Sequence, residues 1–527
     1  MQAGNRILDL MNDTAEVLFE RYGPNYRWLV TIFGLMGGFA MVLSATIANV
    51  AVPQVMGAFG VGQDQAQWMS TAFLTTMTVS QLLNHWMGEA FGQRGAFTIT
   101  ILVFLVGTVV GWFAPTIDVL IVGRILQGFS AGIITPMVMV TMFQVFPPDK
   151  RGLAMGIYGS GVVLAPALGP AVGGMAIDAF EWRFIFIMPV PFCLIALVGG
   201  LFFMPSQKRS GPLPHFDWIG YILLGAALAL LMTATANGIR SGWNSGEILL
   251  LFGGGTICAI CFVVAQLYSR NPLLDFSLWT NRRFVAALCV GFVFGGGNFA
   301  SSYVVPVFVQ TVQGYSATEA GLVLMPAGLL LVAALPLTGR IADKYPHHIP
   351  IMVGLCFFAL GIAAMSSADV NTPFWSLVAF FCISRFGLAF IIPSLSVGAL
   401  STLHPSQLSR GSGSVNFIRQ LGGAVGTNLI VVWLQLRTTF HADGLTATQT
   451  AANATSQALL QDVTRQLDAL GISGESSTSL ALAYLSRVIN AQALTFGFQD
   501  CFIALAVVFL IALAPAWIFS RSKQDSS

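Results

Sequence analysis

The chain has 527 residues, of which 55% are hydrophobic and only 9% are charged. An ordinary soluble domain carries about 25% charged residues, so this chain cannot cover a globular surface with groups that water solvates well. The net charge of +2 is uninformative by itself, but the lack of a long basic run argues against a nucleic-acid partner. The composition indicates an all-α integral membrane protein.

The N-terminal segment, residues 1–27, precedes the first long apolar run. Its apolar side chains recur near helical spacing at Ile7, Leu8, Met11, Ala15, Leu18 and Phe19. The segment lacks the continuous apolar core of a signal peptide. The pattern predicts a short amphipathic helix on the cytoplasmic surface of a membrane.

About 20 consecutive apolar residues cross the hydrocarbon layer of a bilayer as a helix. Roughly fourteen such segments follow along the chain, at 28–52, 67–87, 96–114, 118–142, 153–176, 184–204, 217–236, 248–268, 284–310, 318–337, 349–367, 374–397, 412–434 and 498–519. Most connections between them are short, and the exception is 435–497. We therefore expect a multi-pass helical bundle.

An even number of spans places both termini on one side of the membrane, and basic residues decide which side. The connections on the side of the termini carry most of the Arg and Lys residues, whereas the short loops of the other side carry only Arg183 and Arg240. This bias predicts cytoplasmic termini in a bacterial cytoplasmic (inner) membrane.

The long connection 435–497 is expected on the outer, periplasmic side. One apolar helical stripe runs through Leu459, Leu460, Val463, Leu467 and Leu470. Gly471 would end that helix, and residues 480–496 resemble a second one. Two interpretations stay open, a cap lying over the outer mouth and a docking surface for an outer partner.

Two similar glycine-containing turns point to an internal repeat. GEAFGQRG (Gly88–Gly95) follows the second expected span, and GRIADKYP (Gly339–Pro346) follows the tenth. The chain then divides into six spans at 28–205, two extra spans at 206–283, six more at 284–519, and a cytoplasmic tail at 520–527. Two repeated six-helix halves with a site between them are typical of rocking transporters.

Four stretches carry a family resemblance: LSATIANVAVP (Leu43–Pro53), Arg124-Ile-Leu-Gln127-Gly128, APALGPAVGG (Ala165–Gly174) with Gly156 before it, and NFIRQLGGAVGTN (Asn416–Asn428). They resemble the major facilitator superfamily, and within it the fourteen-spanner drug:proton antiporters of the EmrB/QacA type. The resemblance implies a major facilitator fold, two six-helix bundles plus two extra central helices (14 transmembrane helices).

The fifth expected span carries the antiporter motif of that family. Its expected members are Gly156, Gly161, Ala165, Pro166, Gly169, Pro170, Gly173 and Gly174. Small residues four apart share one helix face and allow close helix packing, while the two prolines remove backbone donors. The resemblance implies that this face packs against the other half on the outer side and moves; static packing is the alternative.

Two arginines lie inside expected spans. An arginine in hydrocarbon costs at least about 2.5–3.5 kcal/mol, so Arg124 must face a cavity or a partner. The resemblance implies that Arg124 lies near the central cavity and takes part in proton coupling, with Gln127 one turn further on. A purely structural pairing of Arg124 with helix carbonyls is the alternative. Arg385 has no clear counterpart in the family, and a cavity position and a snorkelling position both stay open.

The two glycine-containing turns hold the inner gate in the resembling family. The expected gate residues are Gly88, Arg94, Gly339, Arg340, Asp343 and Lys344. In relatives a loop aspartate and nearby basic residues form a latch, and the second turn keeps this set around Asp343. The first turn has Gly92 where the family usually has aspartate.

The opening motif departs from the family at Ser44, where the family has aspartate. None of Ser44, Thr46 and Asn49 titrates in a usable range, so we expect them to line the cavity as neutral hydrogen-bonding groups. The same expectation covers Gln310, Arg385, Arg124 and Gln127. His85 and Glu89, one turn apart, are the remaining candidates for a proton relay beside Arg124.

The leading hypothesis is a secondary exporter of amphiphilic compounds, neutral or weakly acidic because the spans offer arginines but no mid-membrane carboxylate. Its partners would be a lipophilic small-molecule substrate, protons, membrane lipid and possibly a periplasmic adaptor with an outer-membrane channel. The alternatives are a fatty-acid or metabolite exporter, an uncoupled facilitator, and more remotely a membrane enzyme or sensor. No cofactor, metal cluster or nucleotide-binding loop is expected.

Overall fold

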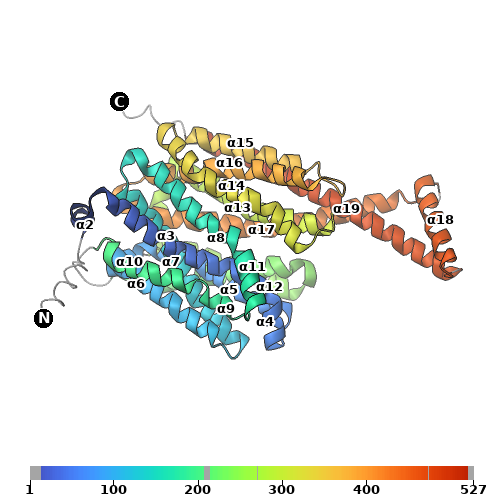
Figure 1. The fold of residues 1–527 in the computed structure, drawn as a ribbon, viewed down its shortest axis with the longest axis horizontal. Coiled ribbons are helices and arrows are strands. Elements are labelled where there is room, and N and C mark those ends of the chain that lie inside the picture. Colours follow the sequence, from blue (N-terminus) through green and yellow to red (C-terminus); the bar gives the residue numbers. More distant parts are fainter. Residues whose placement is uncertain (1–13, 207–213, 270, 451, 473, 520–527) are drawn as a thin grey trace.

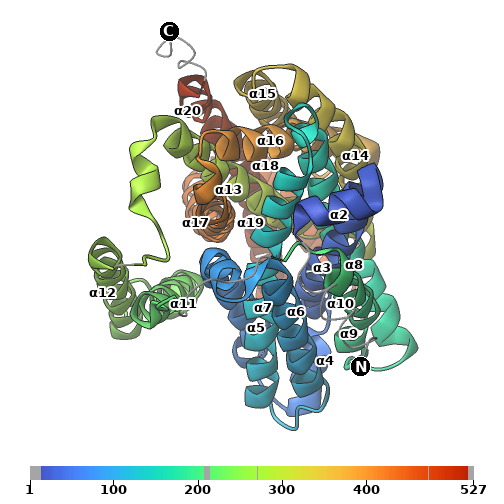
Figure 2. The same cartoon turned by 90° about the vertical axis from the view of Figure 1, so that its left-hand side faces the viewer.

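The computed structural model describes residues 14–206, 214–269, 271–450, 452–472 and 474–519. Within these ranges the regular secondary structure is helical, with no strand. The helices run lengthwise as an elongated bundle (Figure 1). We call the end that holds α2 and α20 the terminal end (Figure 2), and the opposite end, where α18 lies, the hairpin end.

The first half of the chain forms α2 (Ala15–Tyr22), α3 (Tyr26–Val50), α4 (Val52–Phe59), α5 (Gln63–Ser80), α6 (Asn84–Trp112), α7 (Ile117–Val145), α8 (Arg151–Ala179), α9 (Phe184–Ile187) and α10 (Val190–Phe203). Two further helices follow, α11 (Trp218–Ser241) and α12 (Gly246–Tyr268). The second half forms α13 (Arg282–Thr311), α14 (Ala317–Lys344), α15 (His348–Met365), α16 (Phe374–Ser401), α17 (Leu408–Ala447), α18 (Ala454–Ala469), α19 (Glu475–Ile511) and α20 (Leu513–Ile518).

Local sequence signals fix where several helices begin. The hydroxyl of Ser316 accepts from the backbone N–H of Glu319, and the Glu319 carboxylate accepts from the N–H of Ser316, which is a complete capping box for α14. The side chains of Thr116 and Asn281 likewise accept from first-turn N–H groups of α7 and α13. These caps lie in the short turns that the hydropathy pattern predicts.

Twelve helices in the described ranges are long and apolar enough to cross a membrane. One of them, Trp68–Trp112, covers both the second and the third expected span. The chain turns inside this segment at Gly92, whose φ of 70° suits glycine far better than other residues. Helix α8 occupies the place of the fifth expected span. The all-helical membrane fold is therefore confirmed, while the count of fourteen spans stays a prediction.

The apolar residues pack into separate cores in the two halves. Most of one core comes from α3, α5, α6, α7 and α10, including Phe97 and Phe143. Another comes from α13 to α16 with α19 and α20, including Phe308 and Phe358. We call the contact zone between these halves the seam. The domain boundaries at 206 and 284 follow the same division and stay a prediction.

The extra pair α11 and α12 stands beside the two halves (Figure 2). Helix α11 contacts α5 of the first half and α17 of the second. The hydroxyls of Ser80 and Tyr221 lie 3.0 Å apart, and the Asn428 amide donates to the Thr235 hydroxyl at 3.0 Å. This pair therefore lies along one side of the seam.

The segment 435–497 differs from the expected cap. Helix α17 continues without a break for 40 residues, about 60 Å, which is twice the hydrocarbon thickness. Residues 480–496 belong to the 37-residue helix α19, and with α18 these helices project away from the bundle (Figure 1). The Asp500 carboxylate joins α19 to α17 by accepting from Arg437 and His441 at 2.6 and 2.7 Å. The prediction of a cap over the mouth is wrong, because the paired helices extend straight onward.

Candidate functional site

The side chain of Arg124 on α7 holds three helices together inside the first half. Its Nε donates to the Met69 carbonyl of α5 at 3.2 Å, and its Nη1 donates to the Ser44 hydroxyl of α3 at 3.0 Å. Nη1 also donates to the Gln127 Oε1 at 2.8 Å, and Phe73 stacks below the guanidinium at 4.2 Å. Arg124 is 1% exposed. We call this group the first arginine centre.

Neutral oxygen atoms satisfy the first arginine centre. In the described part of the chain, no carboxylate pairs with Arg124, and its acceptors are a hydroxyl, an amide and two carbonyls. The Gln127 amide in turn donates a hydrogen bond to the Thr108 hydroxyl of α6 at 2.9 Å, which connects α6 to this network. Ser44 therefore acts as a hydrogen-bond acceptor for the arginine, and the described residues around the guanidinium offer it neutral partners.

The small-residue stripe of α8 lies against α3 of its own half. A Cβ on Gly161 would contact Leu35, one on Gly169 would overlap the Thr46 hydroxyl, and one on Gly173 would contact Ile47. Ala165 is fully buried in the same layer. In this structure the close approach that small residues permit is used by α3. The expected contact of the stripe with the other half stays a prediction.

Other members of the expected motif have different surroundings. A Cβ on Gly156 would overlap the Leu335 carbonyl of α14, across the seam. Pro166 is exposed, and a Cβ on Gly174 would meet open space. The side chains of Pro170 and of the cavity candidate Asn49 lie outside the described residues. Thr46 donates its hydroxyl to the Leu43 carbonyl of its own helix at 3.0 Å.

The predicted latch at Asp343 is formed between the two halves. The carboxylate at the end of α14 accepts from the backbone N–H groups of Gly152 and Leu153, in the first turn of α8. Unpaired N–H groups and the helix dipole make that turn a favourable place for an anion. Gly152 and Gly339 face each other so closely that a Cβ on either would overlap the other's carbonyl. We call this contact the Asp343 latch.

The remaining expected gate residues do not join the Asp343 latch. Arg340 and Lys344 are exposed, and a Cβ on Gly88 would meet open space. Arg94 is buried, and its Nε donates to the Met204 carbonyl at 2.7 Å. Met204 is the C-cap of α10, so Arg94 stabilises a helix C-terminus within its own half. The expected gate role of Arg94 stays a prediction.

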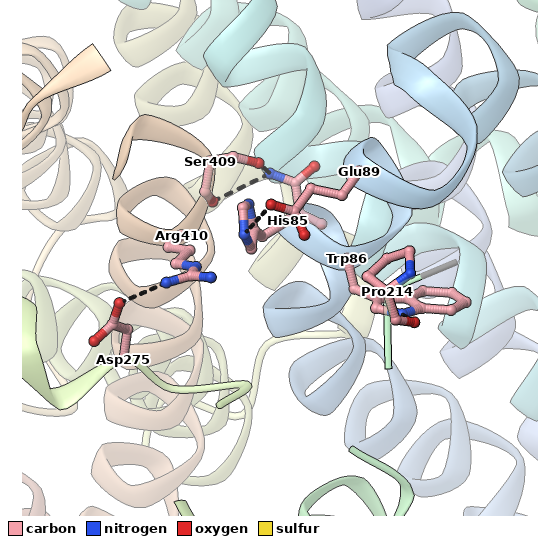
Figure 3. Close-up of polar contacts among 8 residues, drawn as sticks. His85, Trp86, Glu89, Pro214, Asp275, Ser409 and Arg410 are labelled. Atoms are coloured by element: carbon pink, nitrogen blue, oxygen red, sulfur yellow. Dashed lines mark hydrogen bonds and ion pairs between the residues drawn. The ribbon is translucent and has the colours of Figure 1, made fainter. Parts of the chain in front are cut away.

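A second polar contact closes the seam on the side of α6 and α17. The Asn84 amide of α6 donates to the Ser409 hydroxyl at 3.1 Å and to the Ser412 hydroxyl at 3.3 Å, both on α17. His85 Nε2 lies 3.1 Å from the Glu89 carboxylate, beside these bonds. Figure 3 shows the pair facing Ser409 and Arg410 of α17. The two relay candidates therefore meet at the contact between the halves.

The connection before α13 adds a charge to this contact. Arg410 Nη1 donates to the Asp275 carboxylate at 2.9 Å (Figure 3). Partial burial opposes ionisation of Asp275, but hydrogen bonds from Ser277 and Arg410 outweigh it and hold the pKa of Asp275 below its ordinary value. The carboxylate thus stays charged near neutral pH and keeps Arg410 turned toward the connection.

These contacts lie toward the terminal end of the bundle. The Asp343 latch joins the last turn of α14 to the first turn of α8, and Asn84 joins the first turns of α6 and α17. Between them the Asn416 amide donates to the Met139 sulfur at 3.3 Å. The halves are therefore closed together at the terminal end.

The side chain of Arg385 on α16 repeats this arrangement in the second half. Its Nη1 donates to Asn298 Oδ1 of α13 at 2.6 Å, and its Nη2 donates to the hydroxyls of Ser301 and Ser302 at 3.1 and 2.9 Å. Phe381 stacks on the guanidinium at 4.3 Å. We call this group the second arginine centre. The sequence analysis did not single out its three partners on α13, Asn298, Ser301 and Ser302, although they are polar residues inside the expected span 284–310.

The two arginine centres are equivalent by position in the repeat. Arg124 stands on the fourth expected span of the first six, and Arg385 on the fourth of the second six. Each guanidinium binds hydroxyl groups on the first long helix of its half, α3 or α13. Counting helices from the start of each half would have revealed this relation. Gln310 lies far along α13, exposed, and donates to the Pro306 carbonyl of its own helix.

Comparison with known sequences identifies the relatives of this chain. The family model described as Major Facilitator Superfamily matches residues 34–427. The multidrug export protein EmrB of Haemophilus influenzae is 30% identical over 93% of this chain and 95% of its own length. The fatty acid resistance protein FarB of Neisseria gonorrhoeae is 28% identical over 94% of this chain and 96% of its own.

Solved structures agree with the fold. The human organic anion transporter MFSD10 superposes with a TM-score of 0.60 at 14% identity, covering 94% of this chain and 99% of the other. The proton:xylose symporter XylE gives a TM-score of 0.60 at 12% identity, covering 94% and 96%. At these identities the likeness concerns the fold alone.

Proposed function

Since the chain belongs to the Major Facilitator Superfamily, we propose that it is a secondary active exporter of lipophilic small molecules that works by alternating access. The observation that carries the proposal is the closed seam at the terminal end, built from the Asp343 latch and the glycine contacts between α8 and α14. Such a contact between two six-helix halves can open as the halves rock. An enzyme would need catalytic residues, which this contact between the halves does not supply.

We propose that the terminal end faces the cytoplasm and that the substrates are neutral or weakly acidic. The orientation rests on the surplus of Arg and Lys in the connections at this end. The substrate class rests on the two arginine centres, whose charges have neutral partners. The names of the relatives EmrB and FarB, multidrug export and fatty acid resistance, fit amphiphilic compounds of this kind.

The proposed driving ion is the proton. His85 and Glu89 are proposed to carry it, and Arg124 is a further candidate for proton coupling. The pair stands next to the Asn84 bonds that join α6 to α17, so a change of charge there can alter the closure of the seam. The imidazole of histidine can take up and release a proton, which serine cannot do. Export in exchange for protons therefore requires no carboxylate at position 44.

We expect His85→Gln and Glu89→Gln each to reduce substrate-induced proton movement at least tenfold in liposomes that hold the purified protein. Neither glutamine binds or releases a proton, while both keep a polar side chain of similar size. Arg183→Gln, far from the seam in an exposed pair with Glu181, serves as the matched control. Unchanged proton movement in both variants would remove the relay and leave Arg124 as the remaining candidate.

The general function is tested by the same liposomes with a panel of lipophilic compounds. An imposed pH gradient is expected to drive accumulation of neutral and acidic members, and each transported compound is expected to move protons in return. Accumulation without proton movement would support an uncoupled facilitator instead. Failure to move any member of the panel would contradict the exporter.

The projecting helices are the proposed docking surface for a periplasmic adaptor, which would lead to an outer-membrane channel. Helix α18 and the outer parts of α17 and α19 stand free of the bundle and expose Leu470, Tyr484 and Val488. We expect replacement of residues 448–474 by a short Gly-Ser linker to leave transport in liposomes within about twofold and to abolish resistance of whole cells. Equal loss in both assays would instead assign these residues to folding.

A further inference from the structure

The second arginine centre differs from the first in how open it is. Arg124 is 1% exposed, and its hydroxyl partner Ser44 is buried. Arg385 is 5% exposed, but its partner Ser302 is exposed and Asn298 is half-buried. The side chains that cover the guanidinium of Arg385 are thus themselves partly exposed.

Polar residues of α13 lie at the second arginine centre and beyond it toward the hairpin end. Asn298 and Ser302 are four residues apart on α13, so they share one face of the helix, and Ser302 is exposed there. Gln310, also exposed, lies about two turns further along and about 80° round the helix from Ser302. Polar side chains in a membrane helix face protein or a water-filled space. The exposed Ser302 therefore marks the side from which a polar group can reach Arg385.

The charge at this site has neutral partners. Within the ranges that the structure describes, no carboxylate pairs with Arg385, and its acceptors are one amide oxygen and two hydroxyls. A buried cation with neutral partners is costly. A carboxylate would replace these acceptors with a charge-assisted, two-oxygen partner that matches the planar guanidinium.

We infer that Arg385, with Asn298 and Ser302, is the subsite that binds the carboxylate of a lipophilic acid. This inference rests on the proposed function, because it names the substrate class of the same exporter. The hydroxyl and amide that now accept from Arg385 turn toward the arriving anion, and Ser302 Oγ donates to it. Arg124, whose guanidinium is covered by Ser44 and Gln127, is not part of this subsite.

The test compares three probes with the same ten-carbon chain, decanoate, decanol and decyltrimethylammonium. Binding to the full chain in detergent is measured by calorimetry at a pH where decanoate is ionised. We expect Arg385→Gln to weaken decanoate binding by between about 10- and 100-fold, the range for a hydrogen bond to a charged group, and to leave decanol within about twofold. Arg385→Lys is expected to recover part of the affinity, and Arg465→Gln on exposed α18 to behave as wild type.

The outcomes separate the inference from the exporter itself. If Arg385→Gln weakens the binding of decanoate and decanol equally, or changes the binding of neither, Arg385 is not a carboxylate subsite. The chain can still transport the lipophilic panel in that case. If the wild-type chain binds decyltrimethylammonium more tightly than decanoate, the inference also fails. If wild type binds none of the three and transports none in liposomes, the proposed function fails with it. Because Arg385→Gln could unfold the chain, Ser302→Ala is measured too, with an expected loss of about threefold or more for decanoate alone.

Discussion

Replacing Gly156 with alanine is expected to open the terminal end and to reduce transport at least tenfold. A Cβ at this position would overlap the Leu335 carbonyl, and backbone cannot move aside as a flexible side chain can. Helices α8 and α14 must then separate, which costs the closed state about 1–3 kcal/mol, as overpacking does elsewhere. A shift of that size changes the ratio of the two facings by about 5- to 150-fold, so one step of the cycle becomes rare.

Spin labels report this shift directly. In a chain whose seven native cysteines are replaced, labels at the exposed positions Lys150 and Lys344 lie on opposite sides of the seam. We expect a longer and broader distance distribution in Gly156→Ala than in wild type. Gly253→Ala on α12, where a Cβ meets open space, is the matched control. An unchanged distribution together with normal transport would mean that the close approach at Gly156 carries no gating role.

The Asp343 latch was predictable because its chemistry is local. A carboxylate at the end of one helix needs only a neighbouring helix N-terminus, and the turn GRIADKYP supplies the carboxylate at the expected place. The bond that Arg94 makes could not be predicted, because its partner is distant in the sequence. A guanidinium can cap any nearby helix C-terminus, and the sequence does not reveal that Met204, 110 residues away, is the one it reaches.

The sequence also does not predict which helix a small-residue stripe contacts. The spacing of Gly161, Gly169 and Gly173 predicts a close helix partner, but a glycine face carries no side chains that specify one. For the projecting segment the sequence predicted helices around 459–470 and 480–496, and α18 and α19 lie there. It did not predict that α17 runs through the expected boundary at 435, although Ala, Leu and Gln are good helix formers.

The largest functional loss is expected for Arg124→Gln. Glutamine cannot reach Ser44, Met69 and Gln127 together, so the junction of α3, α5 and α7 loses its common donor. The stability is expected to fall, because the lost bonds, worth about 1.5–3 kcal/mol each, together outweigh the roughly 2.5–3.5 kcal/mol of buried-charge cost that disappears. Transport, which depends on the charge and on the geometry, is expected to fall about 100-fold, equivalent to about 2.7 kcal/mol.

Two further variants separate charge from geometry at this centre. Arg124→Lys keeps the charge as a single point and is expected to retain part of the proton movement, whereas Arg124→Gln is expected to retain none. Thr108→Val removes only the far end of the network, the bond from Gln127, and is expected to reduce transport less than tenfold. Transport and the unfolding temperature are measured for all three. A folded Arg124→Gln protein that transports at the wild-type rate and melts well below it would assign Arg124 to structure alone, because an arginine that only holds helices affects melting and leaves proton exchange untouched.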